Sequence, residues 1–382
     1  MKPALFLAAI LFFSLLLHFE RLVVPARLIF DEVYYVPAAR AMLAGKADPN
    51  WVHPPLAKAL IAASIRLFGD SPIGWRLASV ACALPAAAFF FLLARDLFGG
   101  GEGGTDAAVL ASLLYLMDGI TYVQSRIATL DMPMTGFLIP SIYFFRKKRY
   151  VLSSLFLGLS ASCKWGSLLA LPLYALFLPY KSGFRKWGRA AAEILAPCFA
   201  VYFLLFTFMS AGIGHYSVNF FLKNYEMLKF HLRPTMVHPY KAQWWKWLLL
   251  IRPIWYAYAG AANRMRGVVC LPNPLLWWPA LIASLMLVFR LKDDAARFIA
   301  AAVLFFTVPW AISIKGGFMY YLLPASPLMI LALVYWVRKT PLSLALAFCG
   351  TLAGFVLFFP FYAYLSVPDA YFHHMFWLRS WI

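Results

Sequence analysis

The sequence predicts an all-α polytopic membrane protein with about eleven transmembrane helices. Composition indicates the class first: 63% of the 382 residues are hydrophobic and only 13% are charged, and the mean hydropathy is +0.75. A chain with so little polar surface cannot enclose a water-soluble core of this size. Apolar stretches of about 16 to 24 residues recur along it, the length that a helix needs to cross a bilayer core. We therefore expect a single membrane domain over residues 1–382.

The apolar spans and the loops between them predict the topology. The first span follows Met1-Lys2 without a small-residue cleavage site, so it is expected to be an uncleaved signal anchor. If the N-terminus is cytoplasmic, short basic loops such as Arg146–Arg149 and Lys181–Arg189 lie inside, as the positive-inside rule requires. The spans are 3–19, 75–97, 106–122, 132–145, 151–163, 166–180, 190–209, 274–290, 296–312, 318–337 and 342–361.

Two long outer loops divide the domain into parts. Residues 1–209 are expected to form the catalytic N-terminal helices with a first outer loop at 20–74, and residues 210–273 a second outer loop before C-terminal helices at 274–382. In the first loop, Val33–Ala44 and Leu56–Phe68 have the length and composition of two interfacial helices. The second loop is rich in aromatic and basic residues, which suits either an interfacial aromatic belt or a lipid or acceptor groove.

Charge and cysteine content exclude several classes. The formal net charge of +19 does not indicate a nucleic-acid partner, because the basic residues lie between hydrophobic segments and not along one solvated face. The five cysteines show no metal-ligand spacing, so we expect core thiols, with neither a disulfide framework nor a zinc site. No Walker loop, dinucleotide-binding fingerprint or nucleophile elbow is present in the sequence. The cysteines are Cys82, Cys163, Cys198, Cys270 and Cys349.

The acidic pair Asp31-Glu32 is the first candidate for catalysis, because the whole chain has only 15 acidic residues. Adjacent side chains on a helix diverge by about 100 degrees, so one carboxylate is expected to act and the other to support it. A single carboxylate can serve as the general base that deprotonates an attacking hydroxyl. The alternative is that the pair caps the start of a helix.

Charged residues near the outer ends of spans are candidates for binding an anionic lipid head group. Arg76, Arg126 and Lys164 fall there together with Asp131, and arginine offers bidentate contacts to phosphate. The alternatives are snorkelling and an internal pair between Arg126 and Asp131. His53 suits a base, a hydrogen-bonding strut or, with little support from its neighbours, a metal ligand.

Seven motifs in order resemble the protein O-mannosyltransferases, which are membrane C-type (GT-C) glycosyltransferases with a polyprenyl-phosphate mannose donor. The resemblance runs over nearly the whole chain. The motifs are FDE at Phe30–Glu32, HPPLAK at His53–Lys58, SRIATLD at Ser125–Asp131, SCKWGSL at Ser162–Leu168, RPIWYAY at Arg252–Tyr258, NPLLWW at Asn273–Trp278 and FMYYLLPASP at Phe318–Pro327.

The resemblance implies a GT-C fold with eleven spans and an inverting single displacement in which Asp31 is the base, with Glu32 beside it. Arg76 matches a functionally important arginine of the family, and Arg126, Lys164 and His53 are expected to bind the donor phosphate and lipid. Asp131, Lys58 and Arg252 are expected to support the site. The implied donor is a polyprenyl-phosphate mannose, with no firmly bound cofactor and no metal.

The resemblance leaves the acceptor open, because eukaryotic members carry a large folded domain where this chain has only the loop at 210–273. Ser or Thr hydroxyls of proteins are the first expectation, on the outer face of the plasma membrane, and the histidine of HPPLAK favours them. Related C-type enzymes transfer aminoarabinose or other sugars to lipids, so a glycolipid acceptor is the alternative. A lipid transporter or flippase is the rival outside enzymology, although the polar groups gather on one outer face and not at the midplane. The sequence does not determine the oligomeric state.

Overall fold

The structure is a computed structural model that describes residues 3–179, 183–211, 219–233, 238–312 and 316–382. It divides into two compact units, each assembled from separate segments of the chain. Unit 1 comprises Met1–Pro25, Phe90–Ser125 and Val237–Ile382, and unit 2 comprises Ala26–Phe89 and Arg126–Met236. Helix α4 (Pro72–Leu97) contributes residues to both units.

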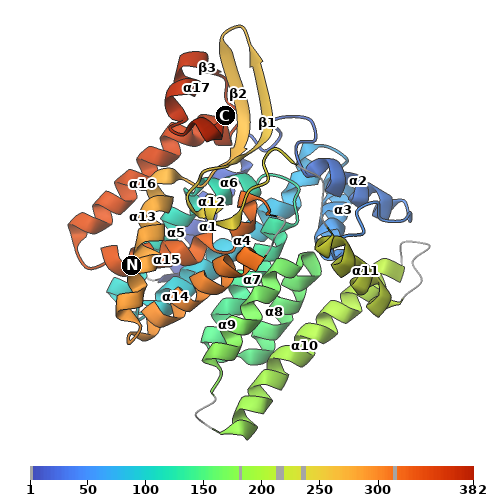
Figure 1. Ribbon diagram of the computed structural model, residues 1–382, viewed down its shortest axis with the longest axis vertical. Helices are drawn as coiled ribbons and strands as arrows, with labels where there is room; N and C mark the ends of the chain where they lie inside the picture. The colour runs from blue at the N-terminus through green and yellow to red at the C-terminus, as the bar shows by residue number, and fades with distance from the viewer. Residues whose placement is uncertain (1–2, 180–182, 212–218, 234–237, 313–315) are drawn as a thin grey trace. The chain divides into compact units, whose positions relative to one another are not determined.

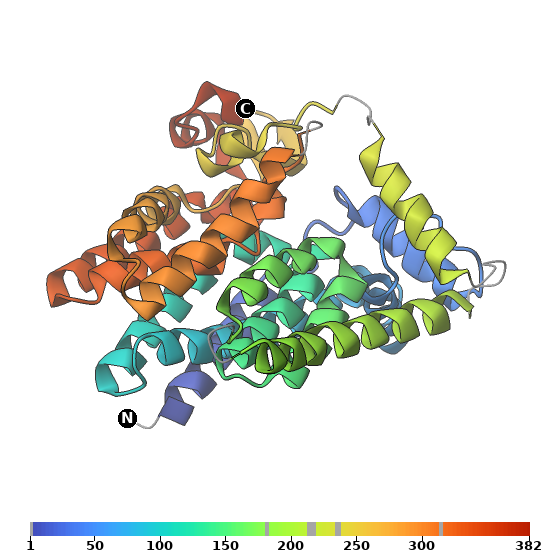
Figure 2. The ribbon, with the colours of Figure 1, turned by 60° about the horizontal axis from the view of Figure 1, so that its bottom comes forward.

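Within the residues described, the regular secondary structure of unit 2 is helical. Helices α7, α8 and α10 lie side by side, and α2 packs on α3 (Figures 1 and 2). Gly158 of α8 permits the close approach of α10, because a Cβ added there would come within 2.7 Å of the Val201 side chain. The helices wholly in unit 2 are α2 (Glu32–Leu43), α3 (Leu56–Phe68), α7 (Asp131–Arg146), α8 (Tyr150–Cys163), a 3-10 helix (Trp165–Leu169), α9 (Ala170–Phe177), α10 (Phe184–Ala211) and α11 (Phe220–Leu232).

The core of unit 2 fastens the first outer loop to the helices behind it. Small and branched side chains such as Val36 and Ala39 of α2, Ala57 and Ile61 of α3, and Cys163 of α8 are fully buried in one cluster. Helices that bury alanine can approach closely, so α2 and α3 form a rigid pair. The two helices expected in the first outer loop are thus confirmed as helices, while their position at a membrane interface stays a prediction.

Unit 1 packs helices α5, α13, α15 and α16 around one another. Its helices are α1 (Pro3–Phe19), α5 (Glu102–Leu116), α6 (Gly119–Gln124), α12 (Trp244–Leu248), α13 (Pro274–Met286), α14 (Asp294–Thr307), α15 (Ser326–Val337), α16 (Pro341–Tyr362) and α17 (Asp369–Met375), with 3-10 helices at Leu287–Arg290, Val308–Ile312, Met319–Leu322 and Arg379–Trp381.

Unit 1 also contains a β-sheet, so the expectation of an all-α chain was wrong in this region. Strands β1 (Ile254–Ala261) and β2 (Arg264–Cys270) form an antiparallel hairpin, and β3 (Val367–Pro368) extends it beside α17 (Figure 1). Ala262 and Asn263 join the strands with φ angles of 48° and 60°, the left-handed conformation that tight two-residue hairpins require. The RPIWYAY motif, which the sequence places in the aromatic-rich second loop, therefore enters a strand.

Every apolar stretch predicted as a span coincides with helical structure, but several are divided. The stretch 106–122 breaks at Asp118, which has extended backbone angles between α5 and α6. The stretch 166–180 begins as a 3-10 helix and its α-helix ends at Phe177. Within the described residues, four helices are long and apolar enough to cross a membrane: Pro72–Leu97, Phe184–Ser210, Asp294–Ile312 and Pro341–Tyr362. The count of eleven spans stays a prediction.

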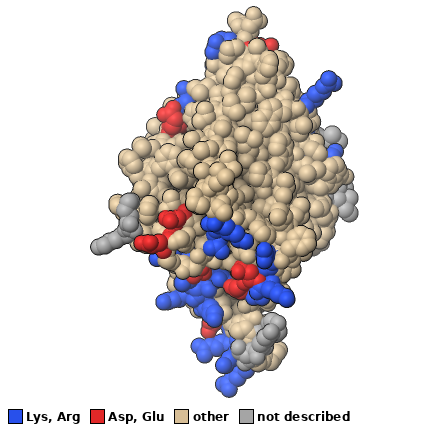
Figure 3. Space-filling model, turned by 90° about the vertical axis from the view of Figure 1, so that its left-hand side faces the viewer, with Lys and Arg blue, Asp and Glu red and all other residues tan. Residues whose placement is uncertain are grey.

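One face shows a broad expanse without charged side chains, with Lys, Arg, Asp and Glu gathered mostly towards one end and a few at the other (Figure 3). Four cysteines are buried as predicted, but Cys349 on α16 is exposed, so it is not a core thiol.

Candidate active site

The two carboxylates of the acidic pair face different surroundings. Asp31 occupies the N-cap position of α2, remains part-exposed, and makes no side-chain capping bond to the helix. Glu32 is completely buried. Phe30, immediately before them, has a φ of 47°, a strained conformation for an aromatic residue that often marks functional sites. The two adjacent acids therefore differ in burial, with Asp31 part-exposed and Glu32 buried.

Glu32 connects three segments of unit 2. Its carboxylate accepts hydrogen bonds from Arg76 Nε at 2.8 Å and Nη2 at 3.0 Å, from the Ile29 amide at 3.0 Å, and from the Ala128 amide at 3.0 Å. Arg76 Nη2 also donates to the carbonyl of Arg27 at 3.1 Å. Removing one partner of such a buried ion pair is costly, because the other charge is then buried without a counter-charge. The Glu32–Arg76 pair therefore fixes the start of α2 against α4 and against the segment that leads into α7.

A second buried ion pair joins the motifs around Asp131 and Lys164. Lys164 Nζ lies 2.7 Å from Asp131 Oδ1, with the lysine side chain 12% and the aspartate side chain 2% exposed. Lys164 has extended backbone angles between α8 and the 3-10 helix that follows, so the ammonium group leaves the helix end and reaches the first residue of α7. Arg126 is also nearly buried. Asp131 therefore pairs with Lys164.

Lys58 organises the loop that precedes α3. Its buried ammonium group donates to the Asp48 carboxylate, to the Asn50 carbonyl at 2.6 Å and to the His53 carbonyl at 2.9 Å. Burial lowers the pKa of Lys58, and the Asp48 carboxylate partly offsets that effect. These three acceptors account for all three N–H bonds of the ammonium group. Lys58 thus holds the loop from Asp48 to His53 in shape.

His53 lies between α2 and α11. Its ring contacts those of Tyr35 and His231, with centroids 6.2 and 5.1 Å away. Desolvation lowers the pKa of His53 well below 6.5, and the positive charges of Lys164, His231 and Lys58 lower it further. A neutral imidazole at physiological pH suits a hydrogen-bonding role. Across the ranges that the structure describes, no three His, Cys, Asp or Glu side chains are grouped to hold a metal ion.

Comparison with known proteins places this arrangement in a family. A family model described as "Dolichyl-phosphate-mannose-protein mannosyltransferase" matches residues 52–211. Among curated relatives, the "Polyprenol-phosphate-mannose--protein mannosyltransferase" of Mycolicibacterium smegmatis is 22% identical over 92% of this chain and 87% of its own length. The protein of the same name from Corynebacterium glutamicum is 23% identical over 92% of this chain and 88% of its own.

Solved structures share the fold. The S. cerevisiae Pmt1-Pmt2 complex bound to the sugar donor has a chain that superposes with a TM-score of 0.85 at 13% identity, covering 100% of this chain and 93% of that one. ArnT from Cupriavidus metallidurans, bound to undecaprenyl phosphate, gives a TM-score of 0.62 at 16% identity over 92% of this chain and 62% of that one. The chain is similar to the protein O-mannosyltransferases over most of its length, and it is a glycosyltransferase.

The part of this mannosyltransferase that the family model matches contains most of the predicted site. Arg76, Arg126, Asp131 and Lys164 lie inside residues 52–211, together with the loop residue His53, whereas the acidic pair precedes the matched segment. All of these residues belong to unit 2.

Arg252, predicted to support the site, belongs to unit 1. Its guanidinium group donates to the Pro239 carbonyl at 3.1 and 3.2 Å and to the Ser380 carbonyl at 3.0 Å. It therefore ties the segment before β1 to the C-terminal residues of the mannosyltransferase.

Two buried acidic residues, Asp48 and Asp118, were not predicted from the sequence to have structural roles. Asp48 precedes Lys58 by ten positions within an irregular loop, so no helical or strand spacing relates the two. Asp118 lay inside a predicted span, yet its buried carboxylate accepts from the Asn273 amide at 3.0 Å and from Ser326 Oγ at 2.6 Å. The only sequence signal for Asp118 is an acidic residue within an apolar stretch, which is costly unless it has partners.

Proposed function

We propose that this mannosyltransferase transfers mannose from a polyprenyl-phosphate mannose to Ser or Thr hydroxyls of proteins, with Asp31 as the general base. The observation that carries the proposal is the difference between the two acids. Glu32 is buried in an ion pair with Arg76, while Asp31 is part-exposed at the start of α2. The names of the curated relatives support the donor and the protein acceptor.

The proposed step is a single displacement with inversion. The Asp31 carboxylate takes the proton of the acceptor hydroxyl as its oxygen attacks the anomeric carbon. The bond between that carbon and the phosphate oxygen breaks, and polyprenyl phosphate leaves with the bonding electrons. Because phosphate is a good leaving group, one carboxylate suffices where many glycosidases need two.

The buried pairs suggest separate roles for the predicted cations. Arg76 and Lys58 are almost entirely buried and engaged with Glu32 and Asp48, so we assign them positioning roles. Lys164 retains more exposure than either of them, which favours it for contact with the donor phosphate. Arg126, a nearly buried cation of the same unit, is the second candidate. The reaction would take place on the extracytoplasmic face of a plasma membrane.

The Asp31→Asn variant tests the proposal. We expect it to fold normally and to lose at least about 100-fold in transfer from polyprenyl-phosphate mannose to a threonine peptide, the usual contribution of a general base. Asp369→Asn, at an exposed position in unit 1, is the matched control and should retain full activity. Normal turnover by Asp31→Asn would remove Asp31 from the mechanism.

The same purified protein separates the rival acceptors and the transporter. Transfer to the peptide, detected by mass spectrometry, supports the proposal, whereas transfer to a glycolipid alone replaces the protein acceptor. Movement of labelled lipid across vesicles without any sugar transfer would contradict enzymatic function altogether.

A further inference from the structure

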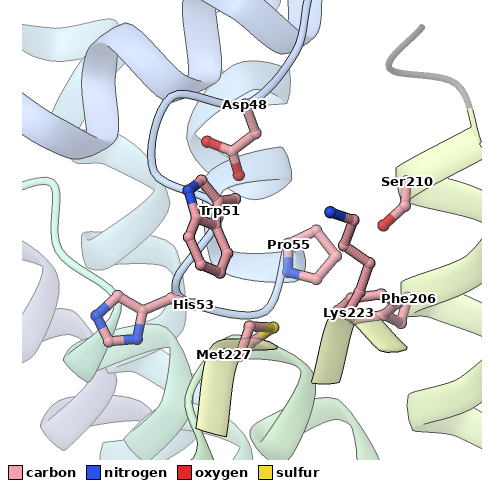
Figure 4. Close-up of a pocket in the computed structure, with 8 residues that line it drawn as sticks. All are labelled: Asp48, Trp51, His53, Pro55, Phe206, Ser210, Lys223 and Met227. Carbon is pink, nitrogen blue, oxygen red and sulfur yellow. The ribbon is translucent and has the colours of Figure 1, made fainter. Parts of the chain in front are cut away.

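Unit 2 contains an open pocket beside the loop that Lys58 organises. It is small, with a cavity volume of about 30 Å³, which has room for one small group and is well below the range of about 300–1,000 Å³ for sites that enclose a whole small ligand. Loop residues form one side, and side chains of α10 and α11 form the other (Figure 4). The pocket is lined by Asp48, Trp51, His53, Pro55, Phe206, Ser210, Lys223 and Met227.

The charges that line this pocket are balanced. Asp48 is paired with the buried Lys58, and Lys223 Nζ lies 2.8 Å from Glu226 Oε2. The lowered pKa of His53 leaves its ring neutral. A site for phosphate needs an excess of positive charge or aligned donors. The pocket therefore suits an uncharged ligand and not the phosphate of the donor.

Aromatic and apolar surfaces supply most of the remaining lining. Trp51 is 37% exposed and its indole packs edge-on against Phe230 of α11 at 5.9 Å, so one ring is held in place while part of it stays accessible. Pro55, Phe206 and Met227 are buried around it. A fixed indole binds apolar ligand surface with little loss of side-chain entropy. The part-exposed Ser210 hydroxyl adds a polar contact at the rim.

The loop side of the pocket is held rigidly. Besides the three bonds from Lys58, His231 Nε2 of α11 lies 2.8 Å from the Val52 carbonyl. His231 also contacts the rings of His53 and Trp165, at 5.1 and 6.1 Å. A preformed surface of this kind binds with less ordering cost than a mobile loop.

The pocket is connected to the proposed base through α2. Tyr35 lies one helical turn after Asp31, and its amide donates to the Asp31 carbonyl at 3.1 Å. The Tyr35 ring contacts His53, which lines the pocket. One turn of helix and one ring contact therefore link Asp31 to the pocket wall.

We propose that this pocket is a subsite for an uncharged segment of the acceptor polypeptide, next to the hydroxyl that receives the sugar. The inference rests on the proposed function. Two observations favour a polypeptide over the donor's lipid tail: the pocket wall mixes an indole with a hydroxyl and an imidazole, and its charges are balanced. A lipid tail would need only apolar contacts.

Two acceptors and two pairs of variants test the subsite. The acceptors are a peptide with one threonine flanked on both sides by several uncharged residues, and N-acetylthreonine amide, which is too short to reach the pocket. For Trp51→Ala we expect about a tenfold rise in KM for the long peptide, with the KM of the short acceptor and of the donor unchanged. Trp51→Phe should restore most of the affinity. Ser210→Trp, which fills the rim, should raise the same KM by a similar factor.

Trp187→Ala is the matched control, because Trp187 lies near the opposite end of α10, about 28 Å from Phe206 at 1.5 Å per residue. It should behave as wild type with every substrate. The subsite would be overturned if a folded pocket variant showed an unchanged KM for the long peptide. Equal changes in KM for both acceptors, or a change in the KM of the donor alone, would overturn it as well. Failure of the wild-type protein to transfer mannose to either acceptor would instead overturn the proposed function.

Discussion

Units 1 and 2 bury their polar groups in different ways. Unit 2 buries opposite charges as pairs, in Glu32 with Arg76 and in Asp131 with Lys164. In unit 1, the buried Asp118 is satisfied by neutral donors, and the ion pair between Arg297 and Asp294 is exposed. Buried charge pairs are costly to assemble, and they persist where geometry must be held near reacting groups. On the function proposed above, unit 2 would carry the chemistry and unit 1 would serve as scaffold.

The largest effect expected from this contrast follows loss of the Glu32 charge. Glu32→Gln leaves the buried Arg76 guanidinium without a counter-charge, so the free energy of unfolding should fall by about 3–5 kcal/mol. Replacing both residues, as Glu32→Gln with Arg76→Met, should recover part of that loss. Thermal unfolding of the purified protein in detergent measures both.

The exposed pair in unit 1 is the control for that experiment. Asp294→Asn removes one partner of a pair in which both side chains are at least half exposed, and it should cost no more than about 1 kcal/mol. If Glu32→Gln were no more destabilising than Asp294→Asn, the two units would not differ as proposed.

An intermediate effect is expected at Asp118. Asp118→Ala leaves the Asn273 amide and the Ser326 hydroxyl without their acceptor, which should lower the free energy of unfolding by about 1–3 kcal/mol. If unit 1 is a scaffold, kcat per folded molecule should change less than twofold. Comparing unfolding with active-site-normalised turnover checks both, and a large fall in kcat at unchanged stability would contradict the scaffold role.

The smallest effect is a pH dependence that originates at His53. Its pKa in the folded protein is below 6.5, so the unfolded chain binds more protons between the two values and stability rises with pH there. Stability should therefore decrease as the pH falls below 6.5 towards the folded pKa. His53→Gln should lose this component between pH 7.5 and 5, whereas the exposed control His373→Gln should retain it.

Much of the fold follows from local sequence alone. Apolar periodicity and proline placement predicted the two helices of the first long loop and helical structure in every apolar stretch. Runs of Ala, Leu, Ile and Met favour a helix whatever they pack against. The hairpin at 254–270 was missed, since aromatic and small residues near a membrane suit an interfacial segment as well as a strand. Its register depends on a turn at Ala262-Asn263 that lacks glycine.

The candidate site could be predicted only in part. Motif resemblance selected Asp31, Glu32, Arg76 and Lys164, and the divergence of adjacent side chains on a helix predicted unequal roles for the two acids. Spacing could not show that Arg76 lies against Glu32, 44 positions away, or that Lys58 closes its loop onto Asp48. Such partners are selected by the desolvation cost of a buried charge, which depends on neighbours from distant segments.

Composition and hydropathy were sufficient to establish a helical membrane protein, because the lack of polar surface is a property of the whole chain that no arrangement can change. The order of the motifs was sufficient to identify the family. The difference between a part-exposed Asp31 and a buried Glu32, and the pocket lined by Trp51, depend on packing among α2, α4, α7, α10 and α11. Those contacts arise from burial, which local sequence does not specify.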